Sequence, residues 1–166
     1  MKLTIELVPS NLWGFSVFGF YNLTNPDKWK NIRKDILRRE GNQCWICGNR
    51  TKRLEAHEFW YYDERSHIQR LAEIHLLCSL CHRIKHIGRW CYTEDGRREF
   101  PNGKEILIKH FIKTNRCSLE EFNQHERESF QIFNERSRHE WTQDFGVYEE
   151  DMRNYLLNKQ LVNPKM

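Results

Sequence analysis

The chain has 166 residues, enough for one domain with appended elements but too few for a second large domain. Hydrophobic residues make up 39% and aromatic residues 13% of the sequence, which excludes a disordered chain and predicts a globular fold. The net charge of +4 permits a polyanionic partner without requiring one.

The cellular location is predicted from the N-terminus and from the apolar runs. The first residues, MKLTIEL, place an acid early, at Glu6, and lack the apolar stretch of a signal peptide. No apolar run approaches the roughly 20 residues that span a bilayer. We therefore expect a cytoplasmic protein with no membrane association, in a reducing compartment where paired cysteines more often bind a metal.

Residues 1–41 are predicted to form two strands and a basic helix. Leu3, Ile5 and Leu7 alternate with polar residues, the pattern of a half-buried strand, and residues 15–20 predict a second strand. Asn25-Pro26-Asp27 has the form of a helix start, and Gly41 marks the expected end. The apolar residues that follow at helical spacing are Trp29, Ile32, Ile36 and Leu37.

Residues 93–166 are predicted to form a turn-rich connection followed by helices. Asp95-Gly96 and Pro101-Asn102-Gly103 are turn formers, so we expect an exposed connection over residues 92–103 and a short helix over residues 104–115. Ser118-Leu119-Glu120-Glu121 has the form of a capping box that begins another helix. A last helix is expected to turn four apolar side chains inward: Tyr148, Met152, Tyr155 and Leu156.

Two CxxC motifs, Cys44-Trp45-Ile46-Cys47 and Cys78-Ser79-Leu80-Cys81, are separated by thirty residues. This spacing predicts a tetrahedral zinc site with four thiolate ligands. Because four thiolates fill the coordination shell, the zinc is expected to be structural. A CxxC motif also suits a thiol-redox pair, so a redox or metal-sensing module stays an alternative.

Histidines follow both motifs, in Leu54-Glu55-Ala56-His57-Glu58 and in Cys81-His82-Arg83-Ile84-Lys85-His86. Over residues 44–90 the sequence resembles the HNH nuclease family. The resemblance implies an α+β fold with a zinc-stapled ββα-metal core. The expected organisation is N-terminal strands and a basic helix in residues 1–41, the HNH-like core in residues 42–92, and the connection and C-terminal helices in residues 93–166, all within one compact domain.

The resemblance also implies roles for the histidines. His57 matches the general base, and imidazole can take a proton from water near neutral pH. His82 matches the histidine that binds the catalytic divalent ion, here Mg²⁺ or Mn²⁺. His86 lies one helical turn further along and is expected to support the site.

The sequence departs from the family pattern at two positions. The family commonly has an acid immediately before the base, where this chain has Ala56, and often has an asparagine where this chain has Glu73. Because Mg²⁺ requires oxygen ligands, we expect Glu58 or Asp63 to replace the missing acid. Glu55 shares the strand face of the base but lies earlier in the hairpin.

Together these features predict a metal-dependent HNH-type endonuclease that hydrolyses phosphodiester bonds of DNA. The alternative is a catalytically inert, zinc-stabilised nucleic-acid-binding or adaptor protein. The aromatic run from Trp60 to Tyr62 suits either base stacking or packing in the hairpin. The side chains expected to contact phosphates are Lys30, Arg33, Lys34, Arg83, Lys85 and Arg89.

Overall fold

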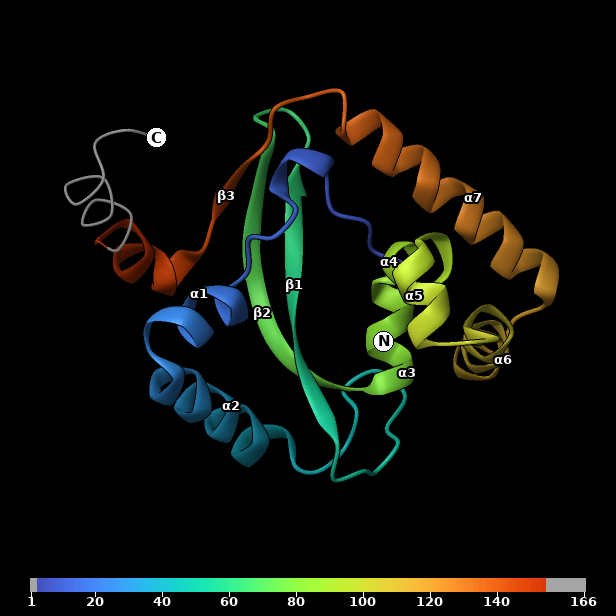
Figure 1. Cartoon of the computed structure of the whole chain (residues 1–166), viewed down its shortest axis with the longest axis horizontal. Helices are drawn as coiled ribbons and strands as arrows, with labels where there is room; N and C mark the ends of the chain where they lie inside the picture. Colours follow the sequence, from blue (N-terminus) through green and yellow to red (C-terminus); the bar gives the residue numbers. More distant parts are fainter. Residues whose placement is uncertain (1–2, 155–166) are drawn as a thin grey trace.

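The computed structural model describes residues 3–154 and has a mixed α+β fold. Helices surround a sheet of three strands (Figure 1). The elements follow in the order η1 (Ser10–Leu12), α1 (Val17–Thr24), α2 (Pro26–Glu40), β1 (Leu54–Asp63), β2 (Ile68–Cys78), α3 (Ser79–Lys85), α4 (Ile87–Tyr92), α5 (Glu94–Glu99), α6 (Gly103–Asn115), α7 (Leu119–Arg136), β3 (Thr142–Asp144) and η2 (Gly146–Tyr148).

The sheet is a long antiparallel hairpin with one short added strand. β1 pairs with β2 from Leu54 opposite Cys78 to Asp63 opposite Ile68, and the register shifts after Phe59. β3 runs parallel to β2, which makes β2 the central strand. β2 ends at Cys78 and α3 begins at the next residue, so the second CxxC motif lies at a strand–helix junction.

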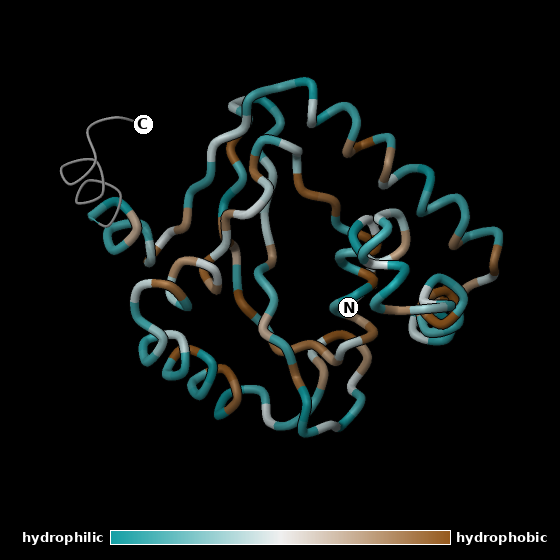
Figure 2. The backbone as a smooth tube through the Cα atoms, in the orientation of Figure 1, coloured by the Kyte–Doolittle hydropathy of each residue, from teal (hydrophilic) through white to brown (hydrophobic). Residues whose placement is uncertain are grey.

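Helices cover the hairpin from two sides. Figure 1 shows α1 and α2 on one side and α3 to α7 on the other. Figure 2 shows mostly hydrophilic residues along α2 and α7 with hydrophobic residues interspersed, as expected for helices that bury one stripe. The core draws on β2, α3, α6 and α7, through side chains that are at most 1% exposed: Leu76, Leu77, Ile84, Phe111 and Phe122.

The N-terminal segment, residues 3–9, lies outside the sheet, so the prediction of a strand there is wrong. Leu3 and Ile5 are buried, as the alternation predicts. Their backbone groups, however, bond to side chains. Asn115 accepts from the Leu3 N–H and donates to the Leu3 carbonyl, both at 2.9 Å, and His125 Nε2 accepts from the Ile5 N–H at 2.9 Å. These side chains satisfy groups that a neighbouring strand would otherwise have to satisfy.

Residues 15–20 are also predicted as a strand, but residues 17–20 form the beginning of α1 and residues 15–16 lead into it. Ser16 is the N-cap, and its hydroxyl accepts from the Gly19 N–H at 2.9 Å, so a local cap outweighs the strand propensity of the aromatic residues. The prediction of α2 is confirmed. Asn25 caps its first turn by accepting from the Lys28 N–H at 3.1 Å, and Gly41, with φ of 74°, ends it.

The exposed connection predicted over residues 92–103 contains a helix, α5. Thr93 caps it, with its hydroxyl accepting from the Gly96 N–H at 3.0 Å. The helix predicted next is confirmed as α6. The capping box before α7 is confirmed too: Ser118 Oγ accepts from the Glu121 N–H at 3.1 Å, and Glu121 Oε2 accepts from the Ser118 N–H at 2.7 Å.

Two of the four apolar side chains predicted to turn inward from the last helix lie within the described residues. Met152 is buried, and Tyr148 packs edge-on against Tyr21 with ring centroids 5.9 Å apart. Tyr155 and Leu156 lie outside the described residues. The division into residues 1–41, 42–92 and 93–166 stays a prediction. No helix within residues 3–154 is both long and apolar enough to span a membrane.

Candidate functional site

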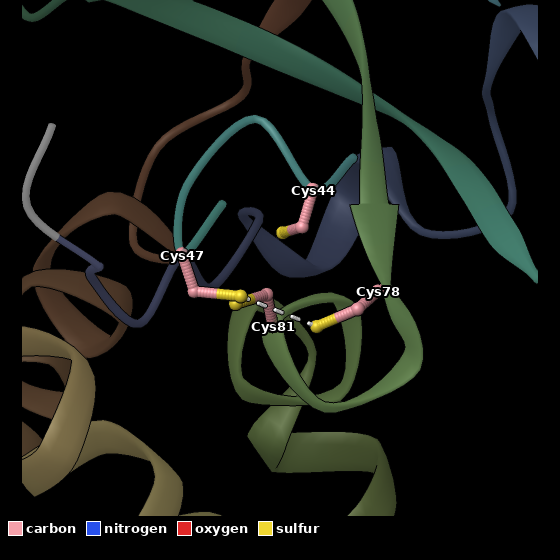
Figure 3. A group of neighbouring side chains, drawn as sticks. All are labelled: Cys44, Cys47, Cys78 and Cys81. Atoms are coloured by element: carbon pink, nitrogen blue, oxygen red, sulfur yellow. Dashed lines mark hydrogen bonds between the residues drawn. The ribbon is translucent and has the colours of Figure 1, made fainter. Parts of the chain in front are cut away.

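The four cysteines of the CxxC motifs lie together, as predicted. Cys44 and Cys47 come from the loop before β1, Cys78 ends β2 and Cys81 belongs to α3 (Figure 3). All four sulfurs lie within 4.8 Å of one another, and each cysteine is free of a disulfide. The group could hold a metal ion such as zinc, since tetrahedral zinc sites are often built from thiolates.

Backbone hydrogen bonds shape the first CxxC motif. The Gly48 N–H donates to the Cys44 carbonyl at 2.9 Å, and the Cys44 N–H donates to the Asn49 carbonyl at 2.9 Å. Gly48 has φ of 70°, a conformation that favours glycine. The Trp45 N–H donates to the carbonyl of Leu76 at 2.8 Å, which fixes this motif to β2 beside the second motif.

The crowded sulfurs favour one thiolate among them. Hydrogen bonds from the thiols of Cys78 and Cys81 lower the pKa of Cys44, and the bonds to Cys44 raise the pKa of both donors. His110 of α6 is also in contact, with Nε2 3.2 Å from Cys81 Sγ. A divalent cation would favour the thiolate at every position, because metal binding displaces the thiol protons.

Three histidines form a second cluster. His57 of β1, His82 of α3 and His86, at the junction of α3 and α4, have ligand nitrogens within 4.8 Å of one another. The ring centroids of His57 lie 5.3 Å from His82 and 4.9 Å from His86, and those of His82 and His86 are 4.8 Å apart. The structure therefore brings together the three histidines for which the family resemblance implies a base, a ligand and a supporting role.

His57 is buried and its ring nitrogens are unpaired. The residue is 4% exposed, and neither Nδ1 nor Nε2 finds a hydrogen-bond partner among the described residues. Burial, with the neighbouring His86 and His82, lowers the pKa of His57 well below its usual value, and burial lowers the pKa of His86 to about 4. A buried polar atom without a partner is costly. The unpaired nitrogens are therefore available to a metal ion or a proton.

Glu55 is an acid in contact with this cluster. Its Oε2 lies 2.8 Å from His82 Nδ1, an ion-pair distance without the alignment of a hydrogen bond. The His82 imidazole lowers the pKa of Glu55. Glu55 and His57 are two residues apart on β1, so their side chains point to the same face. A carboxylate behind Nδ1 of His82 leaves Nε2 of that ring for a metal ion.

The two acids predicted to complete the site lie elsewhere. Glu58 follows His57 on β1 and points to the opposite face, where its Oε1 accepts from the Phe18 N–H in the first turn of α1 at 3.2 Å. Burial raises the pKa of Glu58. Asp63 lies six residues beyond His57 on β1, about 20 Å away at ~3.3 Å per residue, and its Oδ1 accepts from the Ser66 N–H at 3.2 Å. Neither acid is placed to bind an ion at the histidines.

A buried carboxylate, that of Glu40, holds two residues of β2 that contact Trp45 in the first CxxC motif. Glu40, at the end of α2, accepts from the Leu76 N–H at 3.1 Å and lies 2.7 Å from His75 Nδ1. The other ring nitrogen of His75 lies 2.7 Å from Glu73 Oε2, and the ring stacks on Trp45 at 4.0 Å. Glu73, where the HNH family often has asparagine, therefore contacts His75.

The basic side chains predicted on α2 are partly paired within the protein. Lys30 forms an ion pair with Asp27 at 2.9 Å, and Arg33 donates to the Leu54 carbonyl at 2.5 Å. Lys34 is exposed. Of these three side chains, Lys34 and the solvent-exposed Lys30 are the ones available to an anion.

The three basic residues near the histidines that are predicted to contact phosphate differ in their burial and in their partners within the protein. Arg83 lies over two aromatic rings, 4.5 and 4.3 Å from their centroids. Lys85 is 4% exposed and forms a buried ion pair with Glu6 at 3.1 Å. The prediction that Lys85 contacts phosphate at the surface is therefore wrong. Arg89 is exposed and pairs with Glu99 at 3.3 Å.

Sequence reasoning placed Glu55 on the face of His57 by strand alternation but preferred Glu58 or Asp63, because Glu55 lies earlier in the hairpin. The contact between Glu40 and His75 was missed altogether. No local pattern links Glu40 with His75, because the two residues are 35 positions apart.

Comparison with known proteins adds no relative. No family model, curated protein or solved structure matches the chain. The resemblance to HNH nucleases therefore rests on the residues themselves, the two CxxC motifs and the three clustered histidines.

Proposed function

We propose that this chain is a metal-dependent endonuclease of the HNH type that hydrolyses phosphodiester bonds of DNA. The observation that carries the proposal is the convergence of His57, His82 and His86 from a hairpin strand and the helix that follows it. β1, β2 and α3 also occur in the order expected of a ββα-metal core. These features support the proposal together with the four clustered cysteines.

His57 is the general base in this proposal. A neutral imidazole with an unpaired nitrogen is the form that can take a proton from water. The lowered pKa makes His57 a weak base in the free protein. A phosphodiester anion beside the ring would oppose that lowering, because a nearby negative charge favours the imidazolium.

His82 and His86 would hold the divalent ion, and Glu55 would orient the His82 ring. An ion bound there would supply positive charge to stabilise the charge that develops on the phosphate and on the leaving oxygen. The donor set fits Mn²⁺ better than Mg²⁺, because Mg²⁺ prefers oxygen ligands and imidazole supplies nitrogen. Glu55 beside Nδ1 would fix the tautomer that leaves Nε2 free to bind.

The four cysteines would hold a structural zinc. Four thiolates complete a tetrahedral shell, so this ion offers no position to a substrate. Cys81 and His82 are consecutive, and Cys44 and Cys47 lie just before β1. The zinc would therefore fix α3 against the hairpin and set His82 relative to His57.

Phosphate contacts are assigned to the exposed cations Lys30, Lys34 and Arg89. Lys30 and Arg89 hold surface ion pairs, which are worth about 0–1 kcal/mol and can exchange for a phosphate. Arg33, Arg83 and Lys85 are held by other groups of the protein.

The test is nicking of supercoiled plasmid by zinc-loaded protein with added Mn²⁺. His57→Asn should slow nicking about 100- to 10,000-fold, the usual contribution of a general base, while binding Mn²⁺ as the wild type does in calorimetry. His82→Ala should lose both nicking and Mn²⁺ binding. His139→Ala is the matched control, because His139 is exposed and lies in the connection between α7 and β3. It should change neither nicking nor Mn²⁺ binding.

Wild-type protein that never nicks DNA with Mn²⁺ or Mg²⁺ would refute the nuclease proposal. Nicking by His57→Asn at the wild-type rate would refute the role of His57. Tight DNA binding without nicking would favour the inert nucleic-acid-binding protein.

A further inference from the structure

A groove lies beside the histidine cluster and shares His86 with it. Its volume is about 650 Å³, within the range of roughly 300–1,000 Å³ for ligand pockets. It is lined by the segment from Glu6 to Ser16, by α4 and by α7, elements that Figure 1 shows around the same part of the molecule.

Exposed aromatic rings form much of the groove wall. Trp13 is 64% exposed, Phe15 is 62% exposed and Tyr92 is 43% exposed. Trp13 is nevertheless held in place, because its Nε1–H donates to the Val8 carbonyl at 2.9 Å and its ring lies nearly parallel to Phe133, at 6.0 Å and 9°. A fixed, exposed ring is suited to stacking and loses little conformational freedom when a ligand binds.

The polar part of the groove lining favours an anion. Glu6 contributes the acid, but its carboxylate pairs with Lys85, and both side chains are at most 15% exposed. Arg89 lines the groove as well, and its partner Glu99 is about half exposed. An exposed pair of this kind is weak, so Arg89 can turn to a phosphate.

We infer that the groove binds an unpaired nucleobase of the strand to be cut, so that the preferred substrate is single-stranded or locally unwound DNA. This inference rests on the proposed nuclease function. The base stacks on Trp13, and its neighbouring phosphate lies toward Arg89 and His86. Aromatic side chains line the same groove as Arg89 and His86. The groove can therefore contact both the base and the phosphate of one nucleotide.

A paired base does not fit this arrangement. Within a duplex both faces of a base are covered by its stacked neighbours, and exposing one face costs a few kcal/mol of unstacking and unpairing. Single-stranded nucleic acid exposes its bases and stacks them on aromatic side chains. The groove should therefore discriminate against intact duplex.

The experiment measures binding by fluorescence anisotropy of a labelled oligonucleotide and of its duplex, at one fixed salt concentration. The protein is the zinc-loaded, full-length chain carrying His57→Ala, so that cleavage does not interfere. Trp13→Ala in this background should weaken single-strand binding roughly 5- to 150-fold, the range expected for one base–aromatic stack. Trp13→Phe should restore most of it.

Phe18→Ala is the matched control, because Phe18 is an aromatic residue that is 47% exposed on α1 and is not part of the groove. It should leave single-strand binding unchanged. The inference is overturned if duplex binds as tightly as single strand, or if Trp13→Ala binds single strand as the parent does. It is also overturned if Trp13→Ala changes the oligomeric state of the protein and leaves its affinity for single-stranded DNA unchanged. An RNA strand of the same sequence that binds equally well supports the base as the recognised group.

These outcomes are independent of cleavage. A chain that binds single-stranded DNA through Trp13 but never nicks DNA would refute the nuclease proposal and leave the groove's ligand unchanged. A chain that nicks duplex DNA without preferring single strands would refute the groove inference alone.

Discussion

Glu40 is a buried acid at an unfavourable place, and its replacement tests how the first CxxC motif is held. It lies at the C-terminal end of α2, where the helix dipole disfavours a negative charge. Burial alone would raise the pKa of Glu40, but hydrogen bonds from His75, Arg39 and the Leu76 N–H lower it overall. The three donors therefore offset both the burial and the dipole.

Glu40→Ala should lower the free energy of unfolding by about 4 kcal/mol. It leaves the Leu76 N–H and His75 Nδ1 buried without acceptors, at about 1–3 kcal/mol each. Arg39 is 60% exposed and returns to water at little cost. The sum agrees with the ~3–5 kcal/mol typical of breaking a buried pair, and it corresponds to a melting temperature lower by roughly 8–16 °C for a chain of this size.

Urea unfolding at neutral pH and fixed excess zinc measures this loss. Glu73→Ala is the matched control, because Glu73 also lies 2.7 Å from His75 but is 65% exposed. It should cost less than about 1 kcal/mol. Equal losses for Glu40→Ala and Glu73→Ala would refute the argument that burial, and not contact with His75, sets the magnitude.

Four further outcomes are expected. Cys78→Ser should lose the bound zinc in elemental analysis and unfold without a cooperative transition, because structural zinc sites contribute folding energy directly; retention of one zinc per chain would contradict the site. The pKa of Glu40 is lower in the folded protein than its usual 4.5. The stability that wild type gains over Glu40→Gln should therefore be complete above about pH 5 and vanish as the pH falls through the folded pKa; urea unfolding at a series of pH values would show a constant difference if this were wrong. Glu55→Gln should weaken Mn²⁺ binding about 10- to 100-fold in calorimetry without changing the melting temperature; unchanged affinity would argue against its orienting role. Ser118→Ala should cost about 1 kcal/mol in urea unfolding through loss of the capping box; a neutral effect would mean that tertiary contacts alone hold the first turn of α7.

Local chemistry in the sequence predicted the features that depend on neighbours within a few positions. The start of α2 at Asn25 and the capping box at Ser118 are confirmed because the cap side chain accepts from a backbone N–H only three residues further along the chain. The two CxxC motifs likewise predicted the clustered cysteines, since each motif presents two thiolates from one turn.

Local reasoning failed in two situations. One is a shift of one position along a strand, which moves a side chain to the opposite face of the sheet; the other is a hydrogen-bond partner that lies far away in the sequence. Glu58 looked suitable beside His57, yet adjacent strand residues point to opposite faces, and Glu55 contacts the cluster instead. The alternation of Leu3 and Ile5 predicted their burial but not that α6 and α7 would supply their hydrogen bonds.

The sequence by itself therefore determined the cysteine motifs and the helix caps, because these follow from residue chemistry and short spacing, and the resemblance to the HNH family pointed to the three histidines that cluster in the structure. Only the tertiary structure decided which acid meets His82, that Lys85 is buried against Glu6, and that an aromatic groove adjoins His86. Each of these depends on contacts between residues far apart in the chain, and such contacts are set by packing of the hairpin against the helices.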